Sequence, residues 1–296
     1  MRIRTAFELL VEAARSFGRD RASSMGAALA YYTMLSIAPT VLIVVSVAGL
    51  VFGEEAARGE VVEQLRQLMG DNGANAVETL LAHANRPTSG IIGTVGGLFA
   101  MIIGATTVFS ELQAALDKVW RAPAAPKAVG IMGFVRTRLL SLSLVFSLGF
   151  LIMISLLASA ALAALQRWWQ PVIGSFGALA RYADFGTSFL MVTAAFAIIY
   201  KAMPRVHIEW RDVWVGAVLT ALLFTVGKTL IGAYLGTTGV TSPFGAAASL
   251  VAFVIWVYWS TQIFLFGAEL TRVHAESKGR FPPRQDHAIA ADSPAA

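Results

Sequence analysis

Long apolar stretches are the feature that most limits what this chain can fold into. Each of the six stretches is near 20 residues or longer, which allows a helix to cross the roughly 30 Å hydrocarbon core of a bilayer. They lie at about 27–52, 90–110, 139–165, 183–203, 213–235 and 245–270. Charged residues make up only 14% of the 296 residues, against about 25% in soluble domains. The sequence therefore predicts an all-α, polytopic membrane protein with six transmembrane helices.

The distribution of lysine and arginine predicts the orientation of these spans. The segments before span one and after spans two, four and six together hold 17 of the 23 basic residues. The three connections expected on the opposite side hold five, and Lys228 lies inside span five. Because basic residues favour the cytoplasmic side, both termini are expected in the cytoplasm of a cell with this protein in its inner membrane. Should span four at 183–203 fail to cross, the C-terminus would change sides.

The first 25 residues form a separate, amphipathic segment. Apolar side chains recur at helical spacing in Phe7, Leu10, Ala14 and Phe17, among several arginines. This pattern predicts a helix lying on the membrane surface, because its two faces suit lipid and water. A cleavable leader is not expected, since no continuous apolar core follows the basic residues. An ordinary cytoplasmic helix packed on loops is the alternative.

The outer connection at 54–89 is too long for a simple turn. Apolar residues at helical spacing before and after Gly70 predict two short helices joined near residues 70–73. With more acidic than basic residues, the loop is expected to be a solvated connector; the alternative is a lid or partner surface. The six-helix domain is expected over residues 26–272, and the tail at 273–296, with its two adjacent prolines, is expected to be disordered.

Tryptophans give an independent check on the span boundaries. Amphipathic indole rings favour the membrane interface, and five of the seven tryptophans lie at predicted span ends: Trp120, Trp168, Trp169, Trp210 and Trp214. The other two, Trp256 and Trp259, fall at mid-depth in span six. Those two are expected to pack on lipid or on neighbouring helices.

Residue types that carry out catalysis are scarce in this sequence. The chain has no cysteine, which excludes thiol nucleophiles, disulfides and thiolate metal sites. Its four histidines are scattered, and no pair has metal-ligand spacing. The nucleotide-binding pattern Gly-x-x-x-x-Gly-Lys-[Ser/Thr] and the nucleophile pattern Gly-x-Ser-x-Gly are both missing. We therefore expect neither an enzyme nor a bound metal or cofactor.

Lys228 is the clearest polar residue within a span. An ionisable side chain at mid-membrane costs on the order of 3 kcal/mol, so such residues commonly mark a substrate or ion pathway. Lys228 follows Asp212 by about 24 Å of helix, which places it in the outer third of the bilayer. It either lines a cavity for an anionic group or extends its ammonium outward to the phosphate layer.

Other polar residues are expected in the cytoplasmic half of the bundle. Glu269, Glu111 and Gln262, with Tyr31 and Tyr32 of span one, are candidates for the wall of an inward-opening polar cavity. The alternative is that both glutamates are interfacial and pair with nearby arginines. The arginines available for this are Arg136, Arg138 and Arg272.

Two backbone features complete the candidate site. Pro39 removes a hydrogen bond deep in span one, so the carbonyl of Leu35 needs another partner, such as Ser36 or water. Interrupted helices often border transport sites, although kinks are also common as purely structural features. Small residues four apart predict close helix contacts: Gly93 and Gly97, Ser143 and Ser147, Ser155 and Ser159, and Gly232 and Gly236.

Four motifs stand out along the chain. They are residues 28–39 (ALAYYTMLSIAP), residues 111–120 (ELQAALDKVW), Tyr200 with Pro204 and Trp210, and residues 253–260 (FVIWVYWS) followed by 265–269 (LFGAE). Together these motifs resemble the YihY/BrkB family of bacterial inner-membrane proteins. The resemblance extends over about residues 20–272 and implies six spans with both ends inside. One departure is Asp117, where the family pattern has asparagine. The ribonuclease name once used for this family conflicts with the residues, because no metal-binding cluster is present.

The leading hypothesis is a transporter or flippase-like handler of a lipid or other anionic, amphiphilic envelope component. Membrane lipids are the expected partners, a homo-oligomer is possible, and nucleic acid is not expected because topology accounts for the basic residues. The alternative function is a non-transporting scaffold for envelope assembly. Net pumping would need an ion gradient, whereas equilibration of lipid between leaflets would need none.

Overall fold

The computed structural model describes residues 6–84, 91–123, 177–237 and 247–281. Within these ranges the chain is helical and contains no strand. The helices are α1 (Ala6–Arg19), α2 (Ala22–Phe52), α3 (Glu54–Ala84), α4 (Ile91–Val119), α6 (Gly177–Ala202), α7 (Trp210–Thr237) and α8 (Ala248–Ser277). The all-helical prediction is confirmed for this part of the chain, and the predicted span at 139–165 lies outside it.

Three helices are long and apolar enough to cross a membrane among the described residues. They are Ala22–Ser46 of α2, Trp210–Tyr234 of α7 and Ala248–Ser277 of α8. A shorter apolar segment, Ser188–Ala202, lies in α6, the span that the sequence marks as the weakest. The count of six spans stays a prediction. Helix α8 also continues beyond the predicted domain boundary at 272, so the start of the expected tail is helical.

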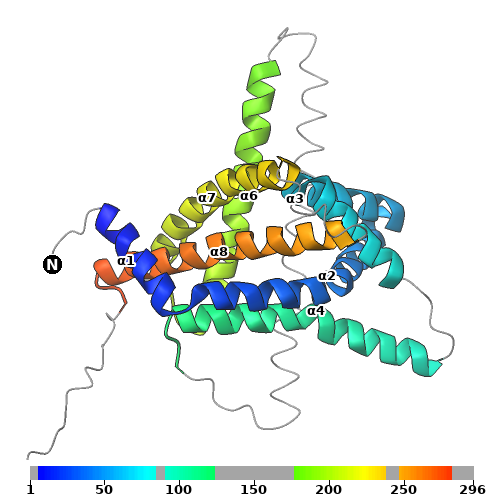
Figure 1. The fold of residues 1–296 in the computed structure, drawn as a ribbon, viewed down its shortest axis with the longest axis horizontal. Coiled ribbons are helices and arrows are strands. Elements are labelled where there is room, and N and C mark those ends of the chain that lie inside the picture. Colours follow the sequence, from blue (N-terminus) through cyan, green and yellow to red (C-terminus); the bar gives the residue numbers. More distant parts are fainter. Residues whose placement is uncertain (1–5, 85–90, 124–176, 238–246, 282–296) are drawn as a thin grey trace, which may run out of the picture.

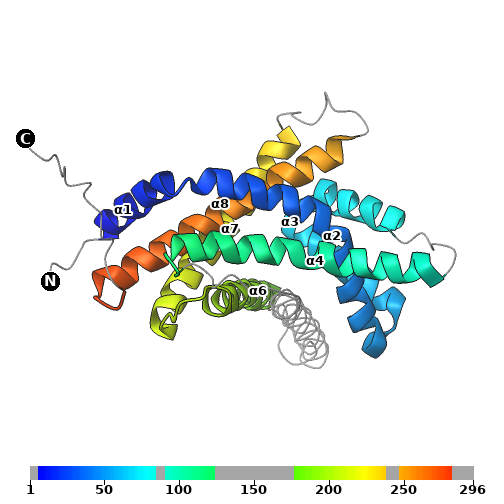
Figure 2. The same cartoon turned by 90° about the horizontal axis from the view of Figure 1, so that it is seen from below.

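The long helices form a bundle, with the short helix α1 at one end and the kinked helix α3 at the other. Helices α2, α4 and α8 run side by side, while α7 packs on α8 and α6 packs on α7 (Figure 1). Helix α1 lies against the C-terminal part of α8, and α3 lies at the opposite end against α2 and α8 (Figures 1 and 2). We call the end that contains α1 the inner end, and the other the outer end.

Five helix termini meet at the inner end. Helices α2 and α7 begin there, and α4, α6 and α8 end there (Figure 2). Bonds between elements tie these termini together: Gln113 of α4 donates to the carbonyl of Met203 after α6 (2.9 Å), and Arg280 after α8 pairs with Asp212 of α7 (3.1 Å). These two bonds hold the last turns of α4 next to the end of α6, and the end of α8 next to the start of α7.

Glycines allow α7 and α8 to approach closely. Thr271 of α8 lies against Gly216 of α7, and Thr220 of α7 lies against Gly267 of α8; an added Cβ would meet the threonine hydroxyl at 1.7 Å and 1.9 Å respectively. Each threonine hydroxyl donates to the carbonyl of the glycine in its own helix, at 2.7 Å. Of the predicted small-residue pairs, Gly232 is exposed and has no such neighbour within 4 Å.

The long α3 helix is split and packed onto the bundle. Gly70 adopts a left-handed φ of 74°, which breaks the helix where the sequence predicts a turn. Val61, Val77 and Leu81 of α3 are buried in a cluster that includes Phe253 of α8. The expectation of a solvated connector is therefore wrong for the apolar face of α3, because this face packs on α2 and α8 rather than facing water.

Tryptophans divide into exposed and buried sets. Trp210 and Trp214, at the start of α7, are exposed, as a ring at the membrane interface should be. Trp120 differs from its prediction: it is fully buried, and its ring packs edge-on against Phe281. In α8, Trp256 packs against Phe224 of α7 and Trp259 is exposed. Trp168 and Trp169 lie outside the described residues.

Candidate functional site

A buried row of charges on α8 is the most unusual feature of the inner end. Glu269, Arg272 and Glu276 are spaced three and four residues apart, which places them on one face of the helix. The guanidinium of Arg272 donates twice to one oxygen of Glu269, at 2.7 Å and 3.2 Å, and also donates to Glu276. Glu269 and Arg272 are buried, at 0% and 1% side-chain exposure.

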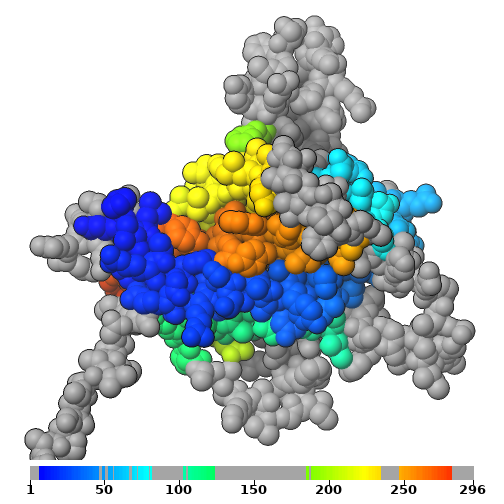
Figure 3. Space-filling view, viewed as in Figure 1, coloured from blue at the N-terminus to red at the C-terminus, as the bar shows by residue number. Residues whose placement is uncertain are grey.

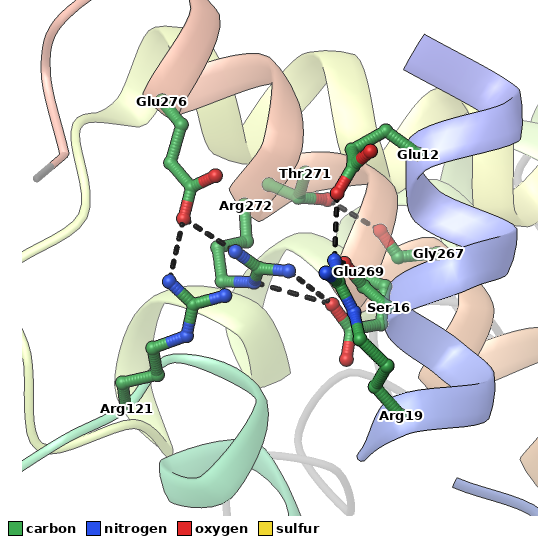
Figure 4. A network of polar contacts seen from close by, with 9 residues as sticks. All are labelled: Glu12, Ser16, Arg19, Arg121, Gly267, Glu269, Thr271, Arg272 and Glu276. Atoms are coloured by element: carbon green, nitrogen blue, oxygen red, sulfur yellow. Dashed lines mark hydrogen bonds and ion pairs between the residues drawn. The ribbon is translucent and has the colours of Figure 1, made fainter. Parts of the chain in front are cut away.

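A second helix joins this row through Arg121. This residue follows α4 with a left-handed φ of 49°, and its guanidinium donates to the same Glu276 oxygen that Arg272 contacts, at 3.1 Å (Figure 4). Two guanidiniums thus share one carboxylate oxygen between α4 and α8. We call Arg121, Glu269, Arg272 and Glu276 the inner ion-pair network.

The turn between α1 and α2 closes one side of this network. Asp20 in that turn lies close enough to Glu269 for the two carboxyl groups to influence each other's charge. Two turns before Glu269 on α8, the Gln262 amide lies against Gly26 of α2 and donates to the carbonyl of Ser23 at 3.4 Å. The start of α2 therefore runs along the polar face of α8.

A second ion pair links α4 to the connection between α6 and α7. The backbone N–H of Arg205 donates to Asp117 at 2.8 Å, and the Arg205 guanidinium pairs with the other oxygen at 3.4 Å. Burial raises the pKa of Asp117 above its ordinary value, and both contacts with Arg205 oppose that rise. Asparagine, which the resemblance noted above leads us to expect at this position, would keep the acceptor without the charge.

The predicted cavity residues are only partly brought together. Glu269 and Gln262 share the α2-facing side of α8, and Glu269 pairs with Arg272, as the interfacial alternative proposed. Tyr31 is exposed and its ring lies edge-on to Tyr32, while Glu111 is half-buried on α4. Their role in a cavity stays a prediction. Arg136 and Arg138, the other possible partners, lie outside the described residues.

Lys228 and Pro39 lie away from the network. Lys228 is half-buried on α7 and forms no ion pair with any residue that the structure describes. The Pro39 ring packs toward Gly104 of α4, so an added Cβ there would meet its Cγ at 3.2 Å. Ser36 donates to the carbonyl of Thr33 at 3.4 Å, and the partner of the carbonyl near Leu35 stays a prediction.

Tyr200 is a buried polar residue for which the sequence alone predicts no role. Its hydroxyl, on α6, donates to the Phe264 carbonyl of α8 at 2.7 Å and lies 3.0 Å from the Thr220 hydroxyl of α7. One side chain thus joins three helices at their crossing. The sequence does not show that the Tyr200 ring is buried or that its hydroxyl bonds to two other helices, although Tyr200 belongs to one of the motifs that carry the resemblance.

Comparison with known proteins identifies the family. The model of the family described as virulence factor BrkB matches residues 13–290. Three bacterial relatives are each called a UPF0761 membrane protein. That of Alkalilimnicola ehrlichii is 26% identical over 92% of this chain and 59% of its own length, and that of Pseudomonas aeruginosa is 26% identical over 87% and 60%. That of Actinobacillus pleuropneumoniae is 27% identical over 82% and 84%.

The chain spans about 60% of the length of the first two of these relatives. No solved structure matches the chain. The family match extends over nearly the whole sequence, and the described helices include three of membrane-spanning length and hydropathy. The chain is a membrane protein of the BrkB family.

Proposed function

We propose that this protein moves an anionic, amphiphilic envelope component across the bacterial inner membrane. In this proposal six spans cross the membrane with both ends in the cytoplasm, and the inner ion-pair network contacts the substrate. A lipid headgroup or a free anionic solute would present the same phosphate or carboxylate chemistry. The proposal needs no nucleotide-driven step, in keeping with the missing nucleotide-binding motif.

The observation that carries this proposal is the burial of Glu269 and Arg272 in a helix of spanning length. Removing both charges from water costs several kcal/mol for each ion, and an apolar pair of similar volume often replaces them without loss of stability. Charged residues within spanning helices commonly mark substrate or ion pathways for this reason. Their presence in α8 favours a role in binding over one in packing.

The sharing of Glu276 suggests how an anion would bind. Arg121 and Arg272 both donate to one oxygen of Glu276, so this carboxylate holds the position that a substrate phosphate or carboxylate would take. An entering anion that displaces Glu276 would break the ion pair between Arg121 and α8, while the apolar contacts of Leu116, Val119 and Trp120 with α8 would remain.

Reconstitution into liposomes tests the proposal. Purified protein should speed the movement of labelled anionic phospholipid between leaflets or the exchange of an organic anion. Arg121→Gln and Arg272→Gln should each reduce that rate at least about tenfold, the loss expected when one charge-assisted bond of about 1.5–3 kcal/mol is removed. Arg66→Gln is the matched control, because Arg66 also pairs with two acids but lies on α3.

Lys228→Met extends the test to the outer half of the bilayer. An unchanged rate in this variant would mean that Lys228 extends to the phosphate layer and does not line a pathway. A protein that moves neither lipid nor solute would contradict transport. That result would favour the second candidate, a scaffold for envelope assembly, which the packed and acid-rich α3 supports because it presents a rigid polar surface at the outer end.

A further inference from the structure

Helix α1 has two apolar sides, and the bundle covers only one of them. On the covered side Ala13 is fully buried, and with Leu9 it forms a cluster with Leu270 and Val273 of α8. Ser16, on the same side, is 1% exposed. This contact docks α1 against the end of α8, so α1 is a fixed part of the inner end.

Three of the four apolar residues in the stripe that the sequence predicts lie on the uncovered side; the fourth, Phe17, packs against Phe266 of α8. Phe7 is 74% exposed and Leu10 is 42% exposed, and Ala14, one turn further, is exposed as well. A shallow groove beside this stripe is lined by Phe7 and Val11 together with the charged residues Glu8, Glu12 and Arg15. Exposed apolar side chains that lie together on a surface, unlike single ones, commonly mark a contact with a membrane or another protein.

The position of α1 indicates what this partner is. The cluster that docks α1 includes Leu219 of α7. Its neighbour Val218 belongs to a stripe of exposed apolar side chains along one face of α7: Trp214, Val215, Val218, Leu222, Val226, Leu230 and Tyr234. In a span this stripe faces lipid. Helix α1 therefore lies at the edge of a lipid-facing surface, and Figure 3 shows both helices on the same side of the molecule.

The depth of the contact agrees with an interfacial helix. Leu219 follows Trp214, an exposed ring at the inner start of α7, by five residues, which is about 7.5 Å of helix. Amphipathic helices in the membrane interface bury their apolar face about 5–10 Å into the boundary between headgroups and acyl chains. The charged side of α1, where Arg19 pairs with Glu12 at 2.6 Å, lies next to the stripe and suits the headgroup layer.

We infer that α1 is a docked interfacial helix, whose Phe7–Leu10 side inserts into the acyl region of the inner leaflet while its Ala13 side holds the bundle. The occupant of the exposed side is lipid, not a second copy of the chain. The Ala13 side of α1 lies beside Glu269, and the turn that follows α1 carries Asp20 (Figure 4). The helix that contacts the inner leaflet is therefore also the helix that covers the inner ion-pair network. This inference stands whether or not the protein transports anything.

The natural absence of cysteine makes a direct test simple. Single variants Phe7→Cys and Leu10→Cys carry an environment-sensitive fluorophore, and Glu8→Cys and Arg15→Cys are the controls on the charged side. The full chain is reconstituted in vesicles of phosphatidylethanolamine and phosphatidylglycerol, with or without bromine on the acyl chains. The far-ultraviolet circular dichroism spectrum of each variant shows that it remains folded.

Bromine near the carboxyl end of the acyl chains should quench the label at residues 7 and 10 at least about twofold more than the label at residues 8 and 15. Equal quenching at all four positions, or none, would overturn the inference. Emission typical of an apolar environment at residues 7 and 10, without quenching by brominated lipid, would also overturn the inference, because a protein surface would then cover the stripe.

Discussion

At the scale of single residues, the contacts of Asp117 make opposing contributions to stability. Burial disfavours its charge, whereas the N–H and the guanidinium of Arg205 favour it, and burial is the larger effect. Because the folded pKa lies above the unfolded value of 3.8, ionisation reduces the stability of the folded state as pH rises through this range. We expect Asp117→Asn to be more stable at pH 7 by up to about 1 kcal/mol, or about 3 °C in Tm.

The comparison of the two proteins across pH checks the sign. Thermal unfolding in detergent should show the difference between Asp117→Asn and the parent at neutral pH, and the difference should vanish as pH falls below 3.8, where both side chains are neutral. A lower Tm for the variant at pH 7 would mean that the Arg205 ion pair outweighs the cost of burial.

Tyr200 allows a second test at the residue scale. Tyr200→Phe removes the hydroxyl that joins α6 to Phe264 and Thr220 but keeps the ring, which stacks on Phe196 and packs against Phe264. We expect a loss of about 1–2 kcal/mol in the free energy of unfolding, since each buried hydrogen bond contributes about 0.5–1.5 kcal/mol. Tyr31→Phe is the matched control and should leave the unfolding midpoint unchanged, because Tyr31 is exposed.

At the scale of helices, the α7–α8 contact depends on glycine at two positions. Gly267→Val would place a Cβ 1.9 Å from the Thr220 hydroxyl, an overlap that forces the helices apart. We expect a loss of at least about 3 kcal/mol, at the upper end of overpacking costs, and poor recovery of folded protein in size-exclusion chromatography. Gly232→Val is the control: Gly232 lies on α7, the partner helix, with open space around it, and this variant should behave like the parent.

The helices also show what the sequence can and cannot predict. The span lengths and the break at Gly70 follow from local patterns, so the positions of α2, α7, α8 and the kink in α3 were predictable. Helix partners were not. Periodic apolar residues in α3 show that it has a buried face but not that α2 and α8 cover it, and Gly232 fits the small-residue pattern without a neighbour.

The candidate site was predictable only where its contacts are local. Glu269 and Arg272 are three residues apart on one helix, and their pairing could be read as an alternative from spacing alone. Arg121 lies 155 residues before Glu276, so only the folded arrangement of α4 against α8 reveals that contact. Trp120 is similar: its position predicts an interface, but Phe281 buries it.

At the scale of the whole molecule, topology is the property on which the proposals depend. Both termini should lie in the cytoplasm because basic residues gather in the segments before span one and after spans two, four and six. A fluorescent protein fused to the C-terminus should therefore be bright, and alkaline phosphatase at the same position should be inactive. An active phosphatase would reverse the orientation of α8 and place the inner ion-pair network at the periplasmic face.

The chain should not tolerate an insertion at the junction between α2 and α3. Gly53, with a φ of 85°, is the single residue between the two helices. One residue inserted into the last turn of α2 would rotate everything beyond it by about 100° about the helix axis. The side of α3 that holds Val61 and Val77 would then turn away from the bundle. Natural variation in chain length should therefore avoid this corner.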